Sequence, residues 1–172
     1  MRNNLFDKAI ISDASCLIGL TNINKLQILK LLFSQIIITP EVEKEYKLPL
    51  PAWITVKDAK DKGMIAEARK NKLDLGESSS IALAIETENS VLILDDDKAR
   101  SFARNKGVAI TGTLTIIGHA CDLGYIDSYE EACHSLKKVN FRISQKVQDE
   151  VAKKLSKNND KSFDNHSRGK SR

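Results

Sequence analysis

Residues 91–97 read VLILDDD: four apolar residues are followed at once by three aspartates. So short an apolar run, rich in branched side chains, predicts a buried strand. Residues 9–13, AIISD, repeat the pattern, with an aspartate closing the run. Carboxylates gathered without cationic partners repel one another, so a fold that gathers them usually neutralises them with a divalent metal ion. Metal ions held by clustered carboxylates are one way in which proteins cleave phosphodiesters.

Short apolar runs alternate with longer helical patterns along most of the chain. Strands are expected at residues 9–12, 36–39, 53–56, 91–94 and 108–110, and helices within 15–32 and at 40–46, 64–70, 77–87, 98–105, 113–123, 129–139 and 145–155. This order predicts the α/β class, with three layers: a central parallel sheet and helices on both of its faces. Ligands of such sheets collect beyond the carboxyl ends of the strands.

Two further acids stand at the start or on the apolar side of expected helices. Glu45 shares a helical face with Val42 and Tyr46, at spacings of three and four. Glu77 opens the helix that follows Leu75 and Gly76, and it stacks over the apolar face of that helix. The expected fold would bring Asp13, Glu45, Glu77 and Asp95 to one end of one sheet. Ligands that are all oxygen suit Mg²⁺ or Mn²⁺ better than zinc.

Each acid also has a simpler structural interpretation. Asp13 and one or two of the three consecutive aspartates are suited to cap the helices that follow them. The side chain of Glu45 is long enough to reach solvent from a short helix. Asp74 and Glu77 have the spacing of a capping box, in which the glutamate stabilises the start of its own helix. The hypothesis of a metal site therefore depends on the joint arrangement of the acids.

Length and charge indicate one domain with a short appendage. The chain has 172 residues and a formal net charge of +4. Residues 153–172 carry seven Lys/Arg against two Asp/Glu, so the remaining 20 Lys/Arg and 21 Asp/Glu leave the body nearly neutral. We expect residues 1–156 to form the domain and residues 157–172 to form a basic, disordered tail, suited either to a polyanion or simply to solvation.

Several classes of protein are excluded or disfavoured. No run of about 18 apolar residues predicts a membrane span, and three cysteines without C-x-x-C spacing predict a reduced, cytoplasmic protein. The sequence lacks the glycine motifs that bind phosphate, so no nucleotide cofactor is indicated. It also lacks a nucleophile elbow and the spacing of zinc ligands. A receiver-like domain would need a lysine late in the sheet, and residues 108–111 supply none.

The acids and the segments around them resemble those of the PIN domain, the nuclease fold of VapC-like toxins of bacterial and archaeal toxin–antitoxin systems. The resemblance spans residues 9–155, and the last segment with its helix resembles the end of one PIN subgroup. The segments that carry it are Ile10–Ser15, Thr39–Val42 with Glu45, Leu75–Glu77 with Ala82 and Ala84, Ile93–Asp96 with Ala99 and Arg100, Thr111–Leu114, and Asn140–Ser144.

The resemblance assigns roles to particular residues. The four acids of the family fall on Asp13, Glu45, Glu77 and Asp95, and a fifth falls on Asp96 or Asp97. The pattern Asp-Asp-x-x-Ala-Arg favours Asp96. Asp13 and Asp95 would hold Mg²⁺ or Mn²⁺, as one ion or two, and Glu77 and Asp96 would complete the site directly or through water.

Three further residues are substrate-binding candidates. Lys98 and Arg100 are suited to contact phosphates, although Arg100 could instead form a structural ion pair. Thr113 would orient a ligand or water, or cap the helix that it begins.

The implied function is a metal-dependent endoribonuclease, acting on RNA as the toxin of a toxin–antitoxin pair. A cognate antitoxin protein and a homodimer are the partners implied by the resemblance. The apolar spacing of Ile143, Val147, Val151 and Leu155 could serve the dimer or pack on the chain's own core. The alternative is a non-catalytic PIN-like module that binds RNA or protein.

Overall fold

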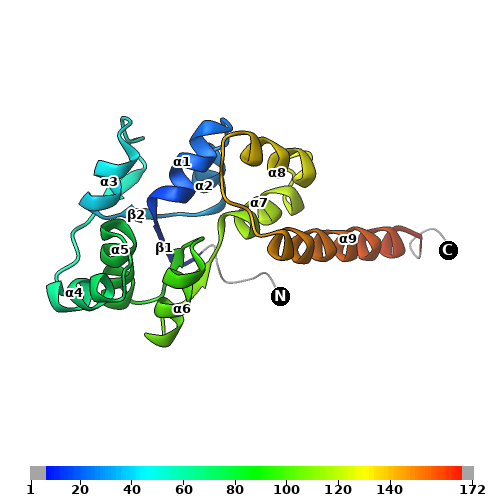
Figure 1. Cartoon of the computed structure of the whole chain (residues 1–172). Helices are drawn as coiled ribbons and strands as arrows, with labels where there is room; N and C mark the ends of the chain where they lie inside the picture. The colour runs from blue at the N-terminus through cyan, green and yellow to red at the C-terminus, as the bar shows by residue number, and fades with distance from the viewer. Residues whose placement is uncertain (1–6, 168–172) are drawn as a thin grey trace. The chain divides into compact units, whose positions relative to one another are not determined.

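The computed structural model describes residues 7–167, with side chains through residue 157. The chain forms two compact units, Met1–Thr113 and Leu114–Arg172. Figure 1 labels the helices and strands. The elements of the first unit are β1 (Ala9–Ser12), α1 (Ala14–Asn22), α2 (Gln27–Leu32), β2 (Ile36–Ile38), α3 (Pro40–Tyr46), β3 (Ile54–Val56), α4 (Lys62–Lys70), α5 (Leu75–Glu86), β4 (Ser90–Ile93), α6 (Asp97–Asn105) and β5 (Ile110–Thr111).

Five strands of the described chain form one parallel sheet in the order β3-β2-β1-β4-β5. The chain moves outward from β1 to β2 and β3, and then returns to the other side of β1 as β4. Ser12 of β1 is in register with Ile93 of β4, so these neighbouring strands end side by side. In open α/β sheets this reversal of strand order leaves a crevice at the carboxyl ends, where ligands bind.

Alternation along the strands divides the core into two layers. Ile11, Ile37 and Leu92 pack into one buried cluster with residues of α4, α5 and α6. Because successive strand residues point to opposite faces, Ile10 and Ile36 must face the other way. Figure 1 shows α1 and α2 on that side of the sheet and α4, α5 and α6 on the opposite side. The predicted three-layer α/β fold with a central parallel sheet is confirmed.

Caps predicted from the sequence explain where several helices begin. Thr39 accepts a hydrogen bond from the backbone N–H of Val42, and Pro40 occupies the first position of α3. The Thr39 hydroxyl also forms a fully buried 2.7 Å hydrogen bond with the Ser79 hydroxyl, which ties the end of β2 to α5.

The second unit contains three helices among the described residues: α7 (Thr113–Asp122, which starts on the last residue of the first unit), α8 (Tyr129–Lys138) and α9 (Gln145–Ser167). Val151 of α9 is buried against Gly118 of α7, where a Cβ on the glycine would lie 2.7 Å from Val151 Cγ1. The predicted apolar face of this last helix therefore packs, at Val151, on the chain's own core.

Two boundaries differ from the sequence prediction. Strand β5 lies at residues 110–111 rather than 108–110. Helix α9 continues to Ser167 instead of ending near Leu155, whereas the basic, disordered tail expected from residue 157 stays a prediction. No Gly or Pro occurs in the helix to end it, and backbone hydrogen bonding needs no apolar partner. The division at residue 156 stays a prediction, and residues 168–172 lie outside the described residues.

No helix in the described part of the chain is both long enough and apolar enough to cross a membrane.

Candidate active site

The candidate site lies at the carboxyl ends of the two central strands. Asp13 directly follows β1, and Asp95 comes two residues after β4. The backbone N–H of Asp13 donates to the carbonyl oxygen of Ile93 at 3.2 Å, so the strands remain paired up to the first acid. This is the place where the strand order reverses.

Asp13 is a buried carboxylate that caps α1. Its side chain is 4% exposed, and its Oδ1 accepts the backbone N–H of Cys16 at 3.2 Å. Burial raises the pKa of Asp13 well above its usual value, and the charges of Asp95, Glu77 and Asp74 raise it further. The cap and the functional interpretation are therefore compatible, because the cap uses one carboxylate oxygen.

Asp95 is held by Thr113 through both of its oxygens. The backbone N–H of Thr113 donates to Oδ1 at 2.9 Å, and the Thr113 hydroxyl donates to Oδ2 at 2.6 Å. Burial raises the pKa of Asp95, while the hydrogen bonds from Thr113 and the charge of Arg100 oppose that rise. The carboxylate is therefore fixed in orientation, while burial disfavours its charged form.

Glu77 and Asp96 form an outer set of acids at the starts of α5 and α6. Glu77 closes a capping box: its Oε2 accepts the N–H of Asp74 at 2.9 Å, and its own N–H donates to Asp74 Oδ1 at 2.7 Å. Asp96 accepts the N–H groups of Lys98 and Ala99, each at 2.9 Å. Partial burial raises the pKa of Glu77, and the charges of Asp74, Asp96 and Glu45 add to the rise.

Glu45 reaches the same outer set from α3. Its Oε1 accepts the N–H of Gly76 at 3.2 Å, in the first turn of α5. Partial burial raises the pKa of Glu45, and the charge of Asp74 raises it further. A Cβ at Gly76 would lie 2.6 Å from Glu45 Oε1, so only glycine admits the carboxylate here. Glu45 belongs to the outer set, because its carboxylate binds the first turn of α5, where Asp74 and Glu77 also lie.

Arg100 is the basic side chain whose charge lowers the pKa of Asp95, and it does so without forming a salt bridge with that carboxylate. Over the residues with described side chains, 7–157, no Lys or Arg forms a salt bridge with Asp13, Glu45, Glu77, Asp95 or Asp96. Positive ends of helices α1, α5 and α6 point at this edge instead, and each carries about half an elementary charge. The charge of the acids is thus offset by helix starts, hydrogen bonds and the charge of Arg100 rather than by salt bridges.

The donors fit a hard divalent cation in kind but do not form a finished coordination shell. All of the acids offer oxygen, which Mg²⁺ and Mn²⁺ prefer. Among the described residues, however, no three Asp, Glu, His or Cys side chains are arranged so that they could already hold an ion. Asp13 and Asp95 are the candidate ligand pair, since Asp13 is buried, Asp95 is half-buried, and the charge of Asp95 raises the pKa of Asp13.

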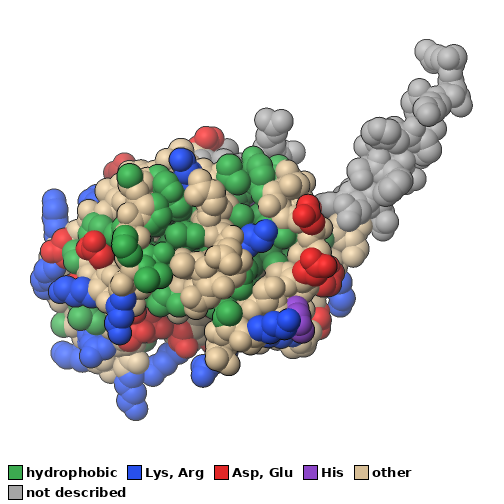
Figure 2. Space-filling model, turned by 90° about the horizontal axis from the view of Figure 1, so that it is seen from above, with side chains coloured by type: hydrophobic (Ala, Val, Ile, Leu, Met, Phe, Trp, Pro, Cys, Tyr) green, Lys and Arg blue, Asp and Glu red, His purple; other side chains and the backbone are tan. Residues whose placement is uncertain are grey.

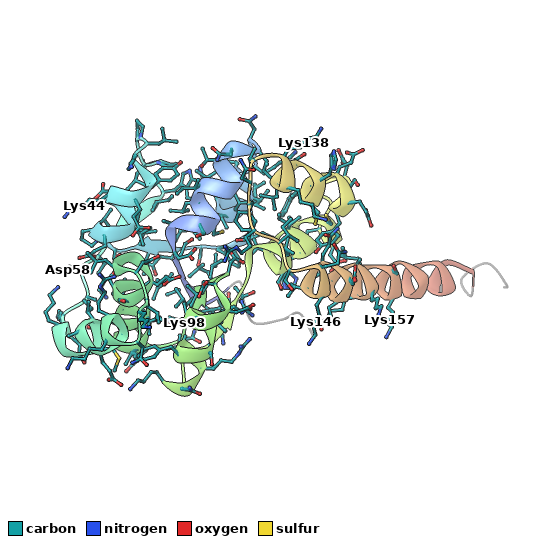
Figure 3. All side chains as sticks on the ribbon, in the orientation of Figure 1. Lys44, Asp58, Lys98, Lys138, Lys146 and Lys157 are labelled. Atoms are coloured by element: carbon teal, nitrogen blue, oxygen red, sulfur yellow. The ribbon has the colours of Figure 1, made fainter. Side chains whose placement is uncertain are left out.

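The three predicted substrate contacts lie in different settings. Thr113 is fully buried and binds Asp95, so in this structure it faces the acid. Arg100 is half-buried and donates from Nη1 to the carbonyl oxygens of Leu94 at 2.6 Å and Thr111 at 3.1 Å. Lys98 is exposed on α6 (Figure 3). Their predicted contacts with substrate stay predictions, and Lys98 is the most accessible of the three.

Two residues at the site were not assigned to it from the sequence. Asp74 raises the pKa of Asp13, Glu45 and Glu77, so it belongs to the outer set. In the sequence, the capping-box spacing accounts for Asp74, so its effect on the neighbouring acids was not predicted. Cys16 is fully buried beside the pair, and burial together with the charge of Asp95 raises the pKa of its thiol.

The fold and this acidic edge define a PIN-like α/β domain, and comparison with known families agrees. A family model described as a PIN domain matches residues 9–157. The chain therefore belongs to the PIN-domain family. No match was found among curated proteins or among solved structures.

Proposed function

We propose that the protein is a metal-dependent endoribonuclease that hydrolyses RNA phosphodiester bonds. The observation that carries the proposal is the pair formed by buried Asp13 and half-buried Asp95 at the carboxyl ends of adjacent strands, where the described side chains form no salt bridge with either carboxylate. Membership of the PIN-domain family, whose fold is that of a nuclease, supports it.

The chain's own residues would divide the work at this edge. Asp13 and Asp95 would hold Mg²⁺ or Mn²⁺, and Thr113 would keep the Asp95 carboxylate in one orientation. When bound, the cation would offset negative charge on the carboxylates and on the phosphodiester in its transition state. Glu77 and Asp96, each with one oxygen engaged in a helix cap, would orient water with the other. Lys98 would contact a neighbouring phosphate.

The direct test is cleavage of a mixed RNA pool in Mn²⁺, in Mg²⁺ and in EDTA. We expect cleavage with either metal, none in EDTA, and none from Asp95→Asn. Asp127→Asn is the matched control, because Asp127 is exposed, belongs to none of the candidate acids and allows the same chemical change. Cleavage that persists in EDTA or in Asp95→Asn would contradict the proposal.

A non-catalytic RNA- or protein-binding module is the second candidate. It is favoured by two observations: every acid of the set already serves a helix start, and no described group of three ligands is formed. The raised pKa of Asp13 also offers a way to relieve repulsion by protonation rather than by a metal. Calorimetry with Mn²⁺ alone separates the candidates, since the module predicts no binding heat that depends on Asp13.

We extend the proposal to a cytoplasmic toxin controlled by an antitoxin, on the basis of the resemblance to VapC-like toxins. Large apolar side chains stay partly exposed on α1 and α2, with Ile18 37% and Leu31 50% exposed. Figure 2 views the molecule from above these helices and shows hydrophobic side chains gathered on that face. Such a surface is suited to a protein partner, either an antitoxin or a second copy of the chain.

Growth of cells that express the chain tests the toxin role. The wild-type protein should arrest growth, and Asp95→Asn should not, at equal protein levels. Arrest by both proteins would separate toxicity from cleavage and contradict the extended proposal.

A further inference from the structure

The inference begins where the pairing of β4 with β5 stops. Leu92 N–H donates to the carbonyl of Ala109 at 2.9 Å, and Leu94 N–H donates to that of Thr111 at 3.0 Å. Hydrogen bonds of a parallel ladder are evenly spaced, so the next bond would run from Thr113 N–H to the carbonyl of Leu94. Thr113 N–H instead donates to Asp95 Oδ1 at 2.9 Å. The ladder between β4 and β5 therefore lacks this bond, and the Thr113 N–H binds Asp95 instead.

Arg100 supplies the donor that the ladder loses. It lies one turn into α6, and its Nη1 donates to the carbonyl of Leu94 at 2.6 Å and to that of Thr111 at 3.1 Å. Leu94 is fully buried, so its carbonyl would otherwise lack both a strand partner and water. One guanidinium nitrogen thus joins the ends of β4 and β5 directly behind Asp95.

Gly112 allows this close approach. A Cβ at Gly112 would lie 3.1 Å from Asp95 Oδ1 and 3.2 Å from Arg100 Nη1, so the glycine touches both groups at once. The guanidinium is close enough that its charge opposes the burial effect on the pKa of Asp95. Asp95, Gly112 and Arg100 therefore form one packed unit.

We propose that Arg100 is a positioning residue for Asp95 and not a contact for the RNA backbone. By holding the carbonyl of Leu94, Arg100 frees the Thr113 N–H to fix the Asp95 carboxylate. The consequence for catalysis rests on the proposed nuclease function, whereas the placement of the carboxylate does not.

The test compares Arg100→Ala and Arg100→Lys with Arg104→Ala, which removes an exposed arginine one turn further along α6. Amide hydrogen exchange reports directly on the Thr113 N–H, with the Leu92 amide of the same sheet as the internal reference. In Arg100→Ala, exchange at Thr113 should rise at least about tenfold more than at Leu92. Arg100→Lys should recover part of the protection, and Arg104→Ala should change neither amide.

Two binding measurements distinguish positioning from phosphate contact. The Kd for Mn²⁺ alone should rise at least about tenfold in Arg100→Ala, the scale expected when support of a ligand is removed. The Kd for a labelled single-stranded RNA, measured in EDTA, should stay within about twofold of the wild type. Loss of RNA affinity with unchanged exchange at Thr113 would overturn the proposal, as would equal acceleration at Thr113 and Leu92.

A third variant keeps the test decisive if Arg100→Ala does not fold. Gly112→Ala leaves Arg100 in place but forces its Cβ between the two groups, so it should also accelerate exchange at Thr113 more than at Leu92. Unchanged exchange in both Gly112→Ala and Arg100→Lys would overturn the positioning role. If the wild-type protein neither binds Mn²⁺ nor cuts RNA, the nuclease proposal fails, and exchange at Thr113 still decides the role of Arg100.

Discussion

The inner pair of acids and the outer set differ in how the fold compensates their charge. Asp13 and Asp95 end neighbouring central strands, where burial is the largest cause of their raised pKa. Asp74, Glu77 and Asp96 lie at the starts of α5 and α6, and Glu45 reaches the start of α5 from α3; the carboxylates of all four accept backbone N–H groups there. The outer acids stabilise the helix starts that they cap or contact, whereas burying the charge of Asp13 and part of that of Asp95 costs stability as long as both stay charged.

This difference separates stability from chemistry within one small edge of the sheet. A carboxylate that caps a helix can be explained by the fold alone. Repulsion between buried Asp13 and half-buried Asp95 cannot be explained in that way, because the fold would be more stable without it. The inner pair is therefore where we expect function to dominate, and the following changes test that division.

The largest effect should come from removing a charge of the inner pair. Asp13→Asn keeps the side-chain oxygen that accepts the Cys16 N–H but removes the repulsion with Asp95. We expect RNA cleavage to fall at least about 100-fold, while Tm without metal rises by about 2–4 °C, as about 1 kcal/mol gives in a chain of this size. Cleavage assays and thermal unfolding check both halves. If Asp13→Asn is less stable and fully active, the inner pair does not differ from the outer set in the way proposed.

A smaller loss is expected in the outer set. Glu77→Gln retains an oxygen for the Asp74 N–H and removes only the charge. Cleavage should fall about tenfold with little change in Tm, because the cap survives. Glu77→Ala should cost about 1 kcal/mol in addition, since the capping box is lost. Steady-state cleavage and chemical denaturation measure the two effects. A loss in Glu77→Gln as large as in Asp13→Asn would place Glu77 with the inner pair.

The contact between Glu45 and Gly76 gives a change in stability alone. Gly76→Ala places a Cβ 2.6 Å from Glu45 Oε1 and should destabilise the fold by about 1–3 kcal/mol. Adding Glu45→Ala removes the obstructing atoms, so the double variant should lose less free energy of unfolding than the sum of the two single losses. Urea unfolding of the four proteins measures the coupling. Strict additivity would show that Glu45 does not occupy this place in solution.

The smallest effect concerns pH. Groups whose pKa is raised on folding bind protons more tightly in the native state, so their destabilising charge is present at high pH and relieved as pH falls through the folded pKa. The pH range concerned begins near the ordinary pKa, which is 3.8 for Asp13 and 4.5 for Glu77, and extends up to the folded pKa of each group. Without metal, Tm should decline gently as pH rises through this range, and the decline should be shallower in Asp13→Asn. Equal slopes in both proteins would remove Asp13 as its source.

The sequence predicted the acidic edge well because strand pattern and acid position are both local signals. Ile10 and Ile11 locate β1, and the aspartate after them must then lie at a carboxyl end. The two-residue β5 was displaced in the prediction because Val108 and Ile110 look equally suited to a strand, and only pairing with Leu92 decides between them. Helix α9 exceeded its predicted end because composition reports on burial and not on backbone hydrogen bonding.

The roles of Asp74 and Arg100 needed the structure for another reason. Each residue has an ordinary local explanation, a capping box for one and a surface ion pair for the other. What distinguishes them is proximity between segments distant in sequence: Glu45 to Asp74, and Arg100 to the carbonyl of Thr111. A single sequence carries no signal for such contacts.

The strand order also bears on the chain while it is being synthesised. Asp13 and Asp95 are separated by 82 positions (95 − 13), and β1 finds its neighbour β4 only after α5 has been made. A nascent polypeptide that stops short of β4 thus contains Asp13, Asp74 and Glu77 but lacks Asp95, whose charge has the largest effect on Asp13. The acidic edge is therefore incomplete until β4 has been synthesised, and pairing over so long a loop makes closure of the edge a late step of folding.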